Sequence, residues 1–303
     1  MKILLLGADG QLGYELHRSC APLGDIVPFT ISGKLPGGQR CGQIDFTQPE
    51  VLPALIAQHR PQLVLNAVAH TAVDRAEAES ALAQRINAEA VAELAEACRS
   101  LDAKLVHYST DYVFAGDARR PIREDDPTNP TSVYGRSKLA GEMAVRDSGC
   151  AHMILRTAWL YAARGQNFLR TALRLVRERD EMSVVNDQIG SPTPSRWLAT
   201  ATALALAKRP DAEGTWHVVA GGECSWHEFA MAIVGDALVA GLIQKAPKLI
   251  GISSRDYPSK AQRPSYSRLD TSKFANDFDF RLPDWRVGVR EVIGELAEAR
   301  AAN

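Results

Sequence analysis

The stretch KILLLGADGQLG, residues 2–13, joins a short apolar run to three glycines. Five residues of strand character come first, and the glycines then recur at every third position, where a helical pattern begins at about residue 12. Glycines so placed permit a tight turn and let a pyrophosphate approach the backbone at the positive end of the helix. The stretch predicts a dinucleotide-binding turn, with a glycine-rich turn that binds nothing as the alternative. The residues expected to contact the dinucleotide are Gly7, Gly10, Gln11, Leu12 and Gly13.

The rest of the chain continues this alternation of short apolar runs and helical patterns. Parallel strands joined by crossover helices produce such a rhythm, so we predict an α/β fold with a Rossmann-type doubly wound parallel sheet. The C-terminal third is less regular and predicts a second, smaller unit. Strands are expected at 2–7, 25–30, 62–69, 104–110, 152–161, 182–186 and 215–220, and helices from about residue 12 and near 49–59, 79–100, 168–179 and 196–208.

Composition limits the classes of partner. The 303 residues are 46% hydrophobic and carry a formal net charge of -1, which predicts a globular protein without a field that attracts nucleic acid or anionic membranes. The opening run is too short for a signal-peptide core and no stretch is long enough to span a membrane, so we expect a cytoplasmic protein. Five scattered cysteines without C-x-x-C spacing argue against disulfides and a zinc site.

The choice of cofactor depends on the end of the second strand, where an acidic residue usually binds the ribose of NAD. That region reads PFTISGK, residues 28–34, and it lacks a carboxylate but contains Ser32 and Lys34. The sequence therefore favours NADPH and leaves NADH open. Asp45 and Phe46 follow the next short strand, where they either flank the adenine or form a turn aspartate with a buried phenylalanine.

Three further motifs stand at strand ends or just after them. Small residues end the run at 65–70, LNAVAH, where Ala67, Val68 and Ala69 would let a cofactor lie flat. Thr110 ends the run KLVHYST. Downstream, VYGRSKLAGE at 133–142 places Tyr134 and Lys138 four residues apart on one helical face, either as a surface pair or as a phenol with an ammonium beside it.

These motifs, in this order, resemble the extended short-chain dehydrogenase/reductases. Within that superfamily the resemblance narrows to the dTDP-4-dehydrorhamnose reductase family, and it covers most of the chain. Two positions depart from the usual family pattern, His70 in place of a tyrosine and Ala162 in place of a glycine. The segments that carry the resemblance are 70–77 (HTAVDRAE), 109–116 (STDYVFAG), 129–142 (NPTSVYGRSKLAGE), 155–162 (LRTAWLYA), 186–193 (NDQIGSPT) and 263–270 (RPSYSRLD).

The resemblance implies an NAD(P)H-dependent oxidoreductase of dTDP-rhamnose and cell-surface polysaccharide biosynthesis. It would reduce the 4-keto group of dTDP-4-dehydro-L-rhamnose to give dTDP-L-rhamnose. Tyr134 would be the general acid, Lys138 would lower its pKa and hold the nicotinamide ribose, and Thr110 would hydrogen-bond the reacting carbonyl. A positive neighbour does favour a phenolate, which supports the pairing independently. The substrate-binding residues implied are Thr71, Val73, Thr110, Tyr112, Trp159 and Arg263.

The same resemblance divides the chain. Residues 1–150 would form the NADP(H)-binding domain, with segments near 176–210 returning to it, and residues 151–303 would form mainly the nucleotide-sugar-binding domain. Relatives can carry Mg²⁺ at a dimer contact, for which Glu15 is the matching position, but we predict no metal here and leave a homodimer open. Two alternatives remain: a nucleotide-sugar epimerase of the same superfamily, and a non-catalytic NADP-binding regulatory subunit.

Overall fold

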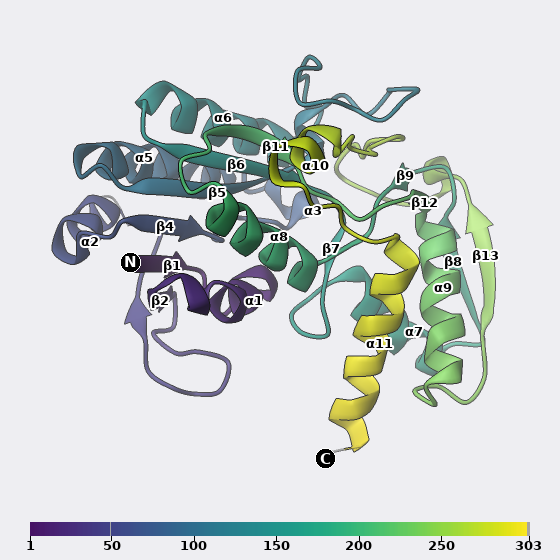
Figure 1. The fold of residues 1–303 in the computed structure, drawn as a ribbon. Coiled ribbons are helices and arrows are strands. Elements are labelled where there is room, and N and C mark those ends of the chain that lie inside the picture. Colours follow the sequence, from purple (N-terminus) through teal and green to yellow (C-terminus); the bar gives the residue numbers. More distant parts are fainter. Residues whose placement is uncertain (49, 302–303) are drawn as a thin grey trace.

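The central sheet of the computed structural model, which describes residues 1–48 and 50–301, has seven parallel strands in the order β11-β6-β5-β4-β1-β2-β3 (Figure 1). The order reverses beside β1, which defines the crevice of a doubly wound fold. The predicted fold class is therefore confirmed. The strands are β1 (Lys2–Leu6), β2 (Asp25–Thr30), β3 (Gly42–Gln43), β4 (Leu63–Asn66), β5 (Lys104–Thr110), β6 (His152–Thr157) and β11 (Gly214–His217).

Alternate residues of the strands enter two different cores. On β1, Ile3 and Leu5 pack with α1 (Gln11–Ser19) and α8 (Ser195–Lys208), whereas Leu4 and Leu6 pack with helices on the opposite face. This two-sided burial explains the continuous apolar runs in the sequence, since both faces of a parallel sheet are covered. The opposite layer contains α2 (Val51–His59), α5 (Ala90–Ser100) and α6 (Val133–Ser148), while α10 (Ser272–Phe278) joins the α1 side.

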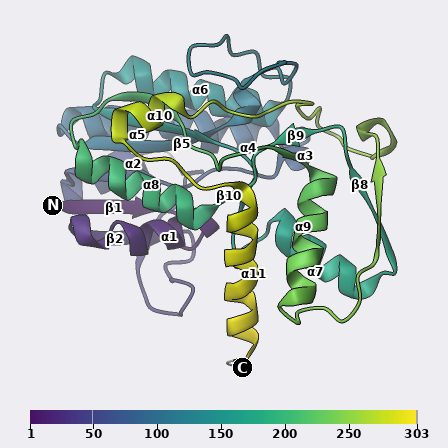
Figure 2. The ribbon, with the colours of Figure 1, turned by 45° about the vertical axis from the view of Figure 1, so that its right-hand side comes forward.

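A further core, separate from the two on the faces of the sheet, lies beside the sheet and is built from later segments (Figure 2). Helices α7 (Phe168–Glu178), α9 (Trp226–Val239) and α11 (Trp285–Ala301) pack around it, and β8 (Glu181–Val185) pairs with β13 (Lys248–Ile252). The run at 182–186 therefore belongs to this unit and not to the central sheet. Two-residue strands complete it: β7 (Leu160–Tyr161), β9 (Ile189–Gly190), β10 (Thr193–Pro194) and β12 (Cys224–Ser225).

Several boundaries differ from those expected. The helix predicted at 79–100 is interrupted, because α4 (Ser80–Gln84) passes into a π-helical turn, η2 (Arg85–Glu89), before α5. The helix predicted near 49–59 begins at Val51, and residue 49 lies outside the described residues. Among the described helices, none has the length and apolar character needed to cross a bilayer.

Candidate active site

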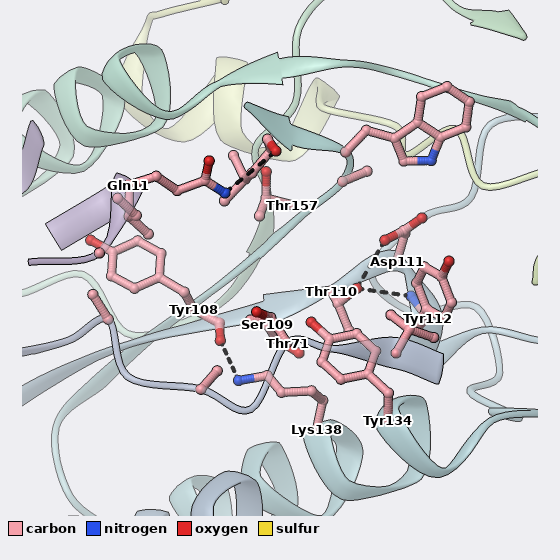
Figure 3. Close-up of a pocket in the computed structure, with 18 of the residues that line it drawn as sticks. Gln11, Thr71, Tyr108, Ser109, Thr110, Asp111, Tyr112, Tyr134, Lys138 and Thr157 are labelled. Carbon is pink, nitrogen blue, oxygen red and sulfur yellow. Dashed lines mark hydrogen bonds between the residues drawn. The ribbon is translucent and has the colours of Figure 1, made fainter. Parts of the chain in front are cut away.

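A cavity of about 540 Å³ opens at the carboxyl ends of β1, β4, β5 and β6, within the usual size of a small-molecule site (Figure 3). The strand order explains the position, because all four strands end at the same edge of the sheet. Most predicted site residues meet here. Those that line the cavity are Gly10, Gln11, Leu12, Ala67, Ala69, Thr71, Val73, Thr110, Tyr112, Tyr134, Lys138, Trp159 and Arg263.

The glycine-rich turn forms one end of the cavity. Gly7 has a φ of +82°, in the left-handed region, and Gly10 is the N-cap of α1 without a side-chain capping bond. The first N–H groups of the helix thus stay available to an anion. A Cβ on Gly13 would lie 2.0 Å from the Gly7 carbonyl oxygen, whereas one on Gly10 would lie 3.3 Å from it. Gly13 is therefore required for the packing of α1 against the turn.

Tyr134 faces the end of β5, where Thr110 and Asp111 lie. The Thr110 hydroxyl donates to Asp111 Oδ1 at 2.9 Å and accepts from the Tyr112 N–H at 3.2 Å. Burial raises the pKa of Tyr134 above its ordinary value, a hydrogen bond with Thr110 lowers it, and the Asp111 and Tyr112 side chains raise it further. The phenol is therefore protonated at neutral pH, the state that a proton donor needs.

Lys138 follows Tyr134 by one turn of α6 and is 2% exposed. Its ammonium donates to the Tyr108 carbonyl at 2.7 Å (Figure 3). The same nitrogen lies 3.3 Å from His107 Nε2. Burial lowers the pKa of Lys138 to about 8, against an opposing effect of Glu142. The pair at 134 and 138 is thus buried beside the cavity, and the alternative of a surface pair is excluded.

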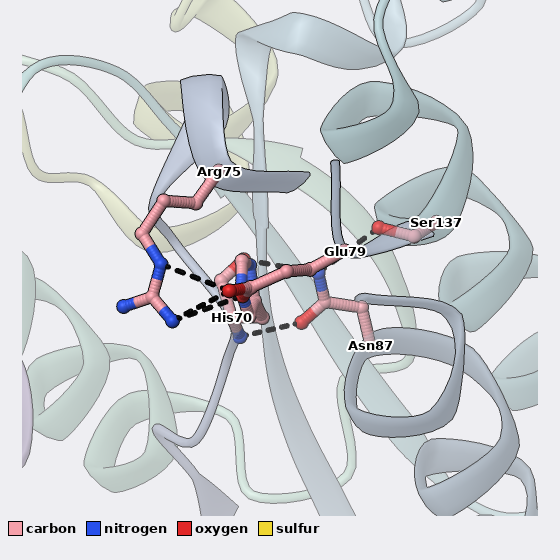
Figure 4. Close-up of polar contacts among 5 residues, drawn as sticks. All are labelled: His70, Arg75, Glu79, Asn87 and Ser137. Atoms are coloured by element: carbon pink, nitrogen blue, oxygen red, sulfur yellow. Dashed lines mark hydrogen bonds and ion pairs between the residues drawn. The ribbon is translucent and has the colours of Figure 1, made fainter. Parts of the chain in front are cut away.

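A buried asparagine joins the loop after β4 to helix α6 (Figure 4). Asn87, on the π-helical turn, accepts from the His70 N–H at 2.8 Å and donates to the His70 carbonyl at 3.1 Å and to Ser137 Oγ at 3.0 Å. The His70 ring contacts Glu79 at 3.2 Å, and Arg75 pairs with the same carboxylate. These bonds hold Ala69 and Thr71 at a fixed position relative to Tyr134.

The opposite wall comes from separate segments. The Trp159 ring stacks on Trp226 with centroids 3.5 Å apart and an interplanar angle of 5°, and its backbone has a φ of +47°. A Cβ on Gly190 would lie 2.5 Å from the Trp159 ring, so only glycine fits behind it. Arg263 donates to Asp74 Oδ2 at 2.8 Å and is therefore already paired with a carboxylate.

Five predicted cofactor-binding residues lie outside the lining. Gly7 and Gly13 act within the turn, and Val68 packs with a core cluster. Phe46 is 3% exposed in the same core, while Asp45 accepts from the Thr47 N–H and hydroxyl, which matches the turn aspartate with a buried phenylalanine. Contacts of Asp45 and Phe46 with a cofactor stay a prediction.

Sequence reasoning also missed several lining residues. Asp111 stands inside a motif already quoted, so its position after Thr110 was a usable signal. Trp226 begins a helix remote in sequence, and Gly165 and Gln166 lie in an irregular loop, where no periodicity marks a residue. The lining residues not predicted are Asp9, Tyr108, Ser109, Asp111, Thr157, Ala158, Leu160, Gly165, Gln166 and Trp226.

Glu15, the position considered for Mg²⁺, is paired with an arginine in this chain. Glu15 Oε2 accepts from Arg196 Nε at 3.3 Å, and the same guanidinium donates to Glu295 at 2.7 Å. A guanidinium thus supplies the positive charge beside these carboxylates. Within residues 1–48 and 50–301, no group of three or more His, Cys, Asp or Glu side chains is placed to hold a metal ion.

Comparison with known proteins places the chain in a family. The model of the RmlD substrate binding domain matches residues 1–298. The dTDP-4-dehydrorhamnose reductase of Shigella flexneri is 44% identical, with 98% of each chain covered, and that of Burkholderia thailandensis is 43% identical, with 98% of this chain and 99% of the relative covered.

Solved structures agree. The dTDP-4-dehydrorhamnose reductase of Bacillus anthracis in complex with NADP superposes with a TM-score of 0.87 and 34% identity, covering 97% of this chain and 99% of that one. The UDP-glucose 4-epimerase of Thermus thermophilus, at 21% identity and a TM-score of 0.81, with 98% of this chain and 99% of that one covered, shares the fold alone. The resemblance seen in the sequence is confirmed, and with it the oxidoreductase class: the chain belongs to the RmlD family of dTDP-4-dehydrorhamnose reductases.

Proposed function

We propose that this protein reduces the 4-keto group of dTDP-4-dehydro-L-rhamnose to give dTDP-L-rhamnose, with Tyr134 as proton donor. The observation that carries the proposal is the single cavity that runs from the uncapped N-terminus of α1 to Tyr134 and Lys138. A pyrophosphate suits the first end, and an acid suits the second. Relatives at 44% identity carry the name of this reaction.

The residues present fit a nicotinamide dinucleotide. The first N–H groups of α1, at Gln11 and Leu12, would hold its pyrophosphate, and the small side chains of Ala67 and Ala69 leave room beside the sheet. When bound, this cofactor supplies the hydride. Tyr134 then gives its proton to the developing alkoxide, and Thr110, next to it, is the candidate to hold the carbonyl.

Lys138 has the role of holding the ribose and making proton donation easier. Lys138 donates one N–H to the Tyr108 carbonyl of β5 and lines the cavity, so a further N–H can serve the ribose. An ammonium near the phenol favours the anion left after proton transfer. The protein also holds the cofactor and the sugar in the orientation that the reaction needs. Such positioning can lower the activation barrier by several kcal/mol.

The sugar and its diphosphate are assigned to the space between Tyr134 and the opposite wall. Val73 and Tyr112 lie beside Tyr134, and the stacked rings of Trp159 and Trp226 offer a flat apolar surface. Arg263 is held by Asp74 and presents a guanidinium to the same cavity, where it would bind a phosphate oxygen. In this division residues 1–150 bind mainly the cofactor and residues 151–303 mainly the nucleotide sugar, although β6, α8 and β11 return to the sheet.

NADPH is expected to bind at least as tightly as NADH. The turn after β2 contains Ser32 and Lys34, and a backbone bridge places Arg40 opposite Lys34. Two cations and no carboxylate between residues 31 and 41 favour a 2′-phosphate. Isothermal titration with each cofactor measures the ratio, and a preference for NADH beyond about tenfold, or ~1.4 kcal/mol, would contradict the assignment.

The reaction itself is tested by stoichiometry. Purified protein, NADPH and dTDP-4-dehydro-L-rhamnose should give one oxidised cofactor for each rhamnose formed. An epimerase would return the hydride and leave the NADPH concentration unchanged, and a regulatory subunit would bind NADPH without turnover. A panel of other nucleotide-linked 4-keto sugars run beside it defines the substrate class. Size-exclusion chromatography with light scattering tests separately whether the protein forms a homodimer, which the sequence leaves open.

A further inference from the structure

His107 is a buried ring in direct contact with Lys138 that the proposed mechanism does not use. It lies on β5, is 0% exposed, and is not part of the cavity lining. Its Nε2 is 3.3 Å from Lys138 Nζ, and its Nδ1 is 3.3 Å from Asn66 Nδ2 at the end of β4. The two ring nitrogens thus each face a nitrogen of a neighbouring side chain.

The orientation of the Asn66 amide follows from its other contact. Asn66 Oδ1 accepts from the Val68 N–H at 3.2 Å, and Asn66 is 1% exposed, so water cannot replace that bond. The NH₂ group is then the part of the amide that faces the ring. Asn66 therefore donates to His107 Nδ1, which must carry no proton.

Counting protons gives the consequence for Lys138. Burial and the neighbouring Lys138 charge hold the pKa of His107 well below its ordinary value, so the ring is neutral and has one donor and one acceptor. With Nδ1 accepting from Asn66, the ring proton stands on Nε2 and points at Lys138. An ammonium there would meet a donor, whereas an amine would accept from it.

We propose that Asn66 and His107 are positioning residues that set the protonation state of Lys138, by presenting an N–H to its nitrogen. The inference rests on the role given to Lys138 in the proposed function. The pair makes release of the third ammonium proton easier, so that Lys138 exchanges between ammonium and amine near the pH of the reaction. Burial separately lowers the pKa of Lys138 to about 8, so the N–H from His107 would act in the same direction as burial.

Other charged groups around Lys138 do not replace this effect. Glu142, one turn along α6, acts to raise the pKa of Lys138, but its carboxylate accepts from Arg156 of β6 at 2.8 and 2.7 Å and from Arg146 at 3.1 Å. Asp111, after β5, and Tyr134 lie toward the cavity. On the side of β4 and the π-helical turn, the polar side chains bonded to the neighbours of Lys138 are neutral amides: Asn66 bonds His107, and Asn87 bonds Ser137.

The proposal predicts a defined tautomer, which nuclear magnetic resonance of ¹⁵N-histidine-labelled full-length protein measures without substrate. His107 should carry its proton on Nε2, and the matching signals should vanish in the assignment variant His107→Gln. Asn66→Asp keeps the shape and the acceptor for Val68 but accepts from Nδ1, so it should move the proton to Nδ1. A wild-type ring protonated on Nδ1, or on both nitrogens, would overturn the proposal.

The second readout is the pH profile of kcat for the wild type and Asn66→Asp. In this variant His107 Nε2 no longer carries a proton, so the Lys138 ammonium should persist to higher pH. The fall of kcat on the alkaline side of the profile should therefore move up by about one pH unit. Asn276→Asp adds a carboxylate at an exposed position of α10 and controls for net charge. If the tautomer moves and the limb does not, the link to Lys138 is wrong while the reductase function stands. If neither the wild type nor Asn276→Asp reduces the substrate, the proposed function fails instead. The tautomer measured by nuclear magnetic resonance still shows which nitrogen of His107 carries the proton.

Discussion

The two walls of the cavity are built in different ways. Thr110, Tyr134 and Lys138 are each less than 10% exposed, and they come from one strand and one helix of the doubly wound fold. Trp159 and Arg263 come from irregular segments, and Trp159 holds a left-handed backbone conformation that side chains rarely adopt. The comparison teaches that this chain places its chemistry on regular elements and its substrate recognition on irregular ones.

The largest effect is expected on the regular wall. Tyr134→Phe removes the proposed proton donor without changing the ring, and proton donation by a placed side chain contributes about 10²–10⁴-fold, so kcat should fall by that factor. Tyr266→Phe is the matched control, since Tyr266 lies outside the cavity lining and its hydroxyl donates to Glu223 at 3.0 Å. Steady-state kinetics with NADPH titration measures both, and a Tyr134→Phe enzyme with near wild-type kcat would contradict the assignment.

The buried carboxylate of Asp111, on the same wall, is expected to lower the free energy of unfolding at neutral pH. Burial raises its pKa from 3.8 to about 6, so the stability linked to this group is fully present below pH 3.8 and is lost as the pH rises through about 6. Asp111→Asn should therefore stabilise the protein at pH 7, by roughly 3 kcal/mol at most. Urea unfolding at pH 5 and pH 7 measures it, with Asp9→Asn as an exposed control. A variant less stable than wild type at pH 7 would show that the hydrogen bond from Thr110 outweighs the burial cost.

Substitutions in the glycine-rich turn should separate a packing role, at Gly13, from a ligand-binding role, at Gly10. Gly13→Ala places a methyl group 2.0 Å from the Gly7 carbonyl oxygen and should cost about 1–3 kcal/mol of stability through overpacking. In Gly10→Ala the nearest atom is 3.3 Å away, so stability should change little while NADPH affinity falls. Thermal unfolding and titration separate the two, and equal unfolding temperatures would refute the packing role of Gly13.

The smallest effect belongs to the irregular wall. Trp226→Ala removes the ring stacked on Trp159, and aromatic pairs contribute about 0.5–1.5 kcal/mol beyond burial, so KM for the sugar nucleotide should rise roughly three- to tenfold. Trp226→Phe should recover part of this. Because the reacting groups are on the other wall, kcat should change less than KM. A larger loss in kcat than in KM would place Trp226 in the chemical step.

The difference between the walls also explains what the sequence could predict. Apolar runs with crossover helices and the spacing of Gly7, Gly10 and Gly13 follow from local rules, and Thr110, Tyr134 and Lys138 stand at strand ends or on a helix. The π-helical turn around Asn87 has no periodic signal. Trp226 and Gly190 meet Trp159 only after the chain has folded, and the Asn66–His107 contacts depend on the register between β4 and β5. Long-range packing decides such pairs.

Transfer of the label from NADPH deuterated at the reactive C4 position tests the central claim most directly. In a reaction with dTDP-4-dehydro-L-rhamnose, the account predicts one deuterium at C4 of the product dTDP-L-rhamnose, one oxidised cofactor for each product, and loss of this transfer in Tyr134→Phe. A product without deuterium at C4, or a sugar converted while the reduced cofactor stays constant, would contradict it.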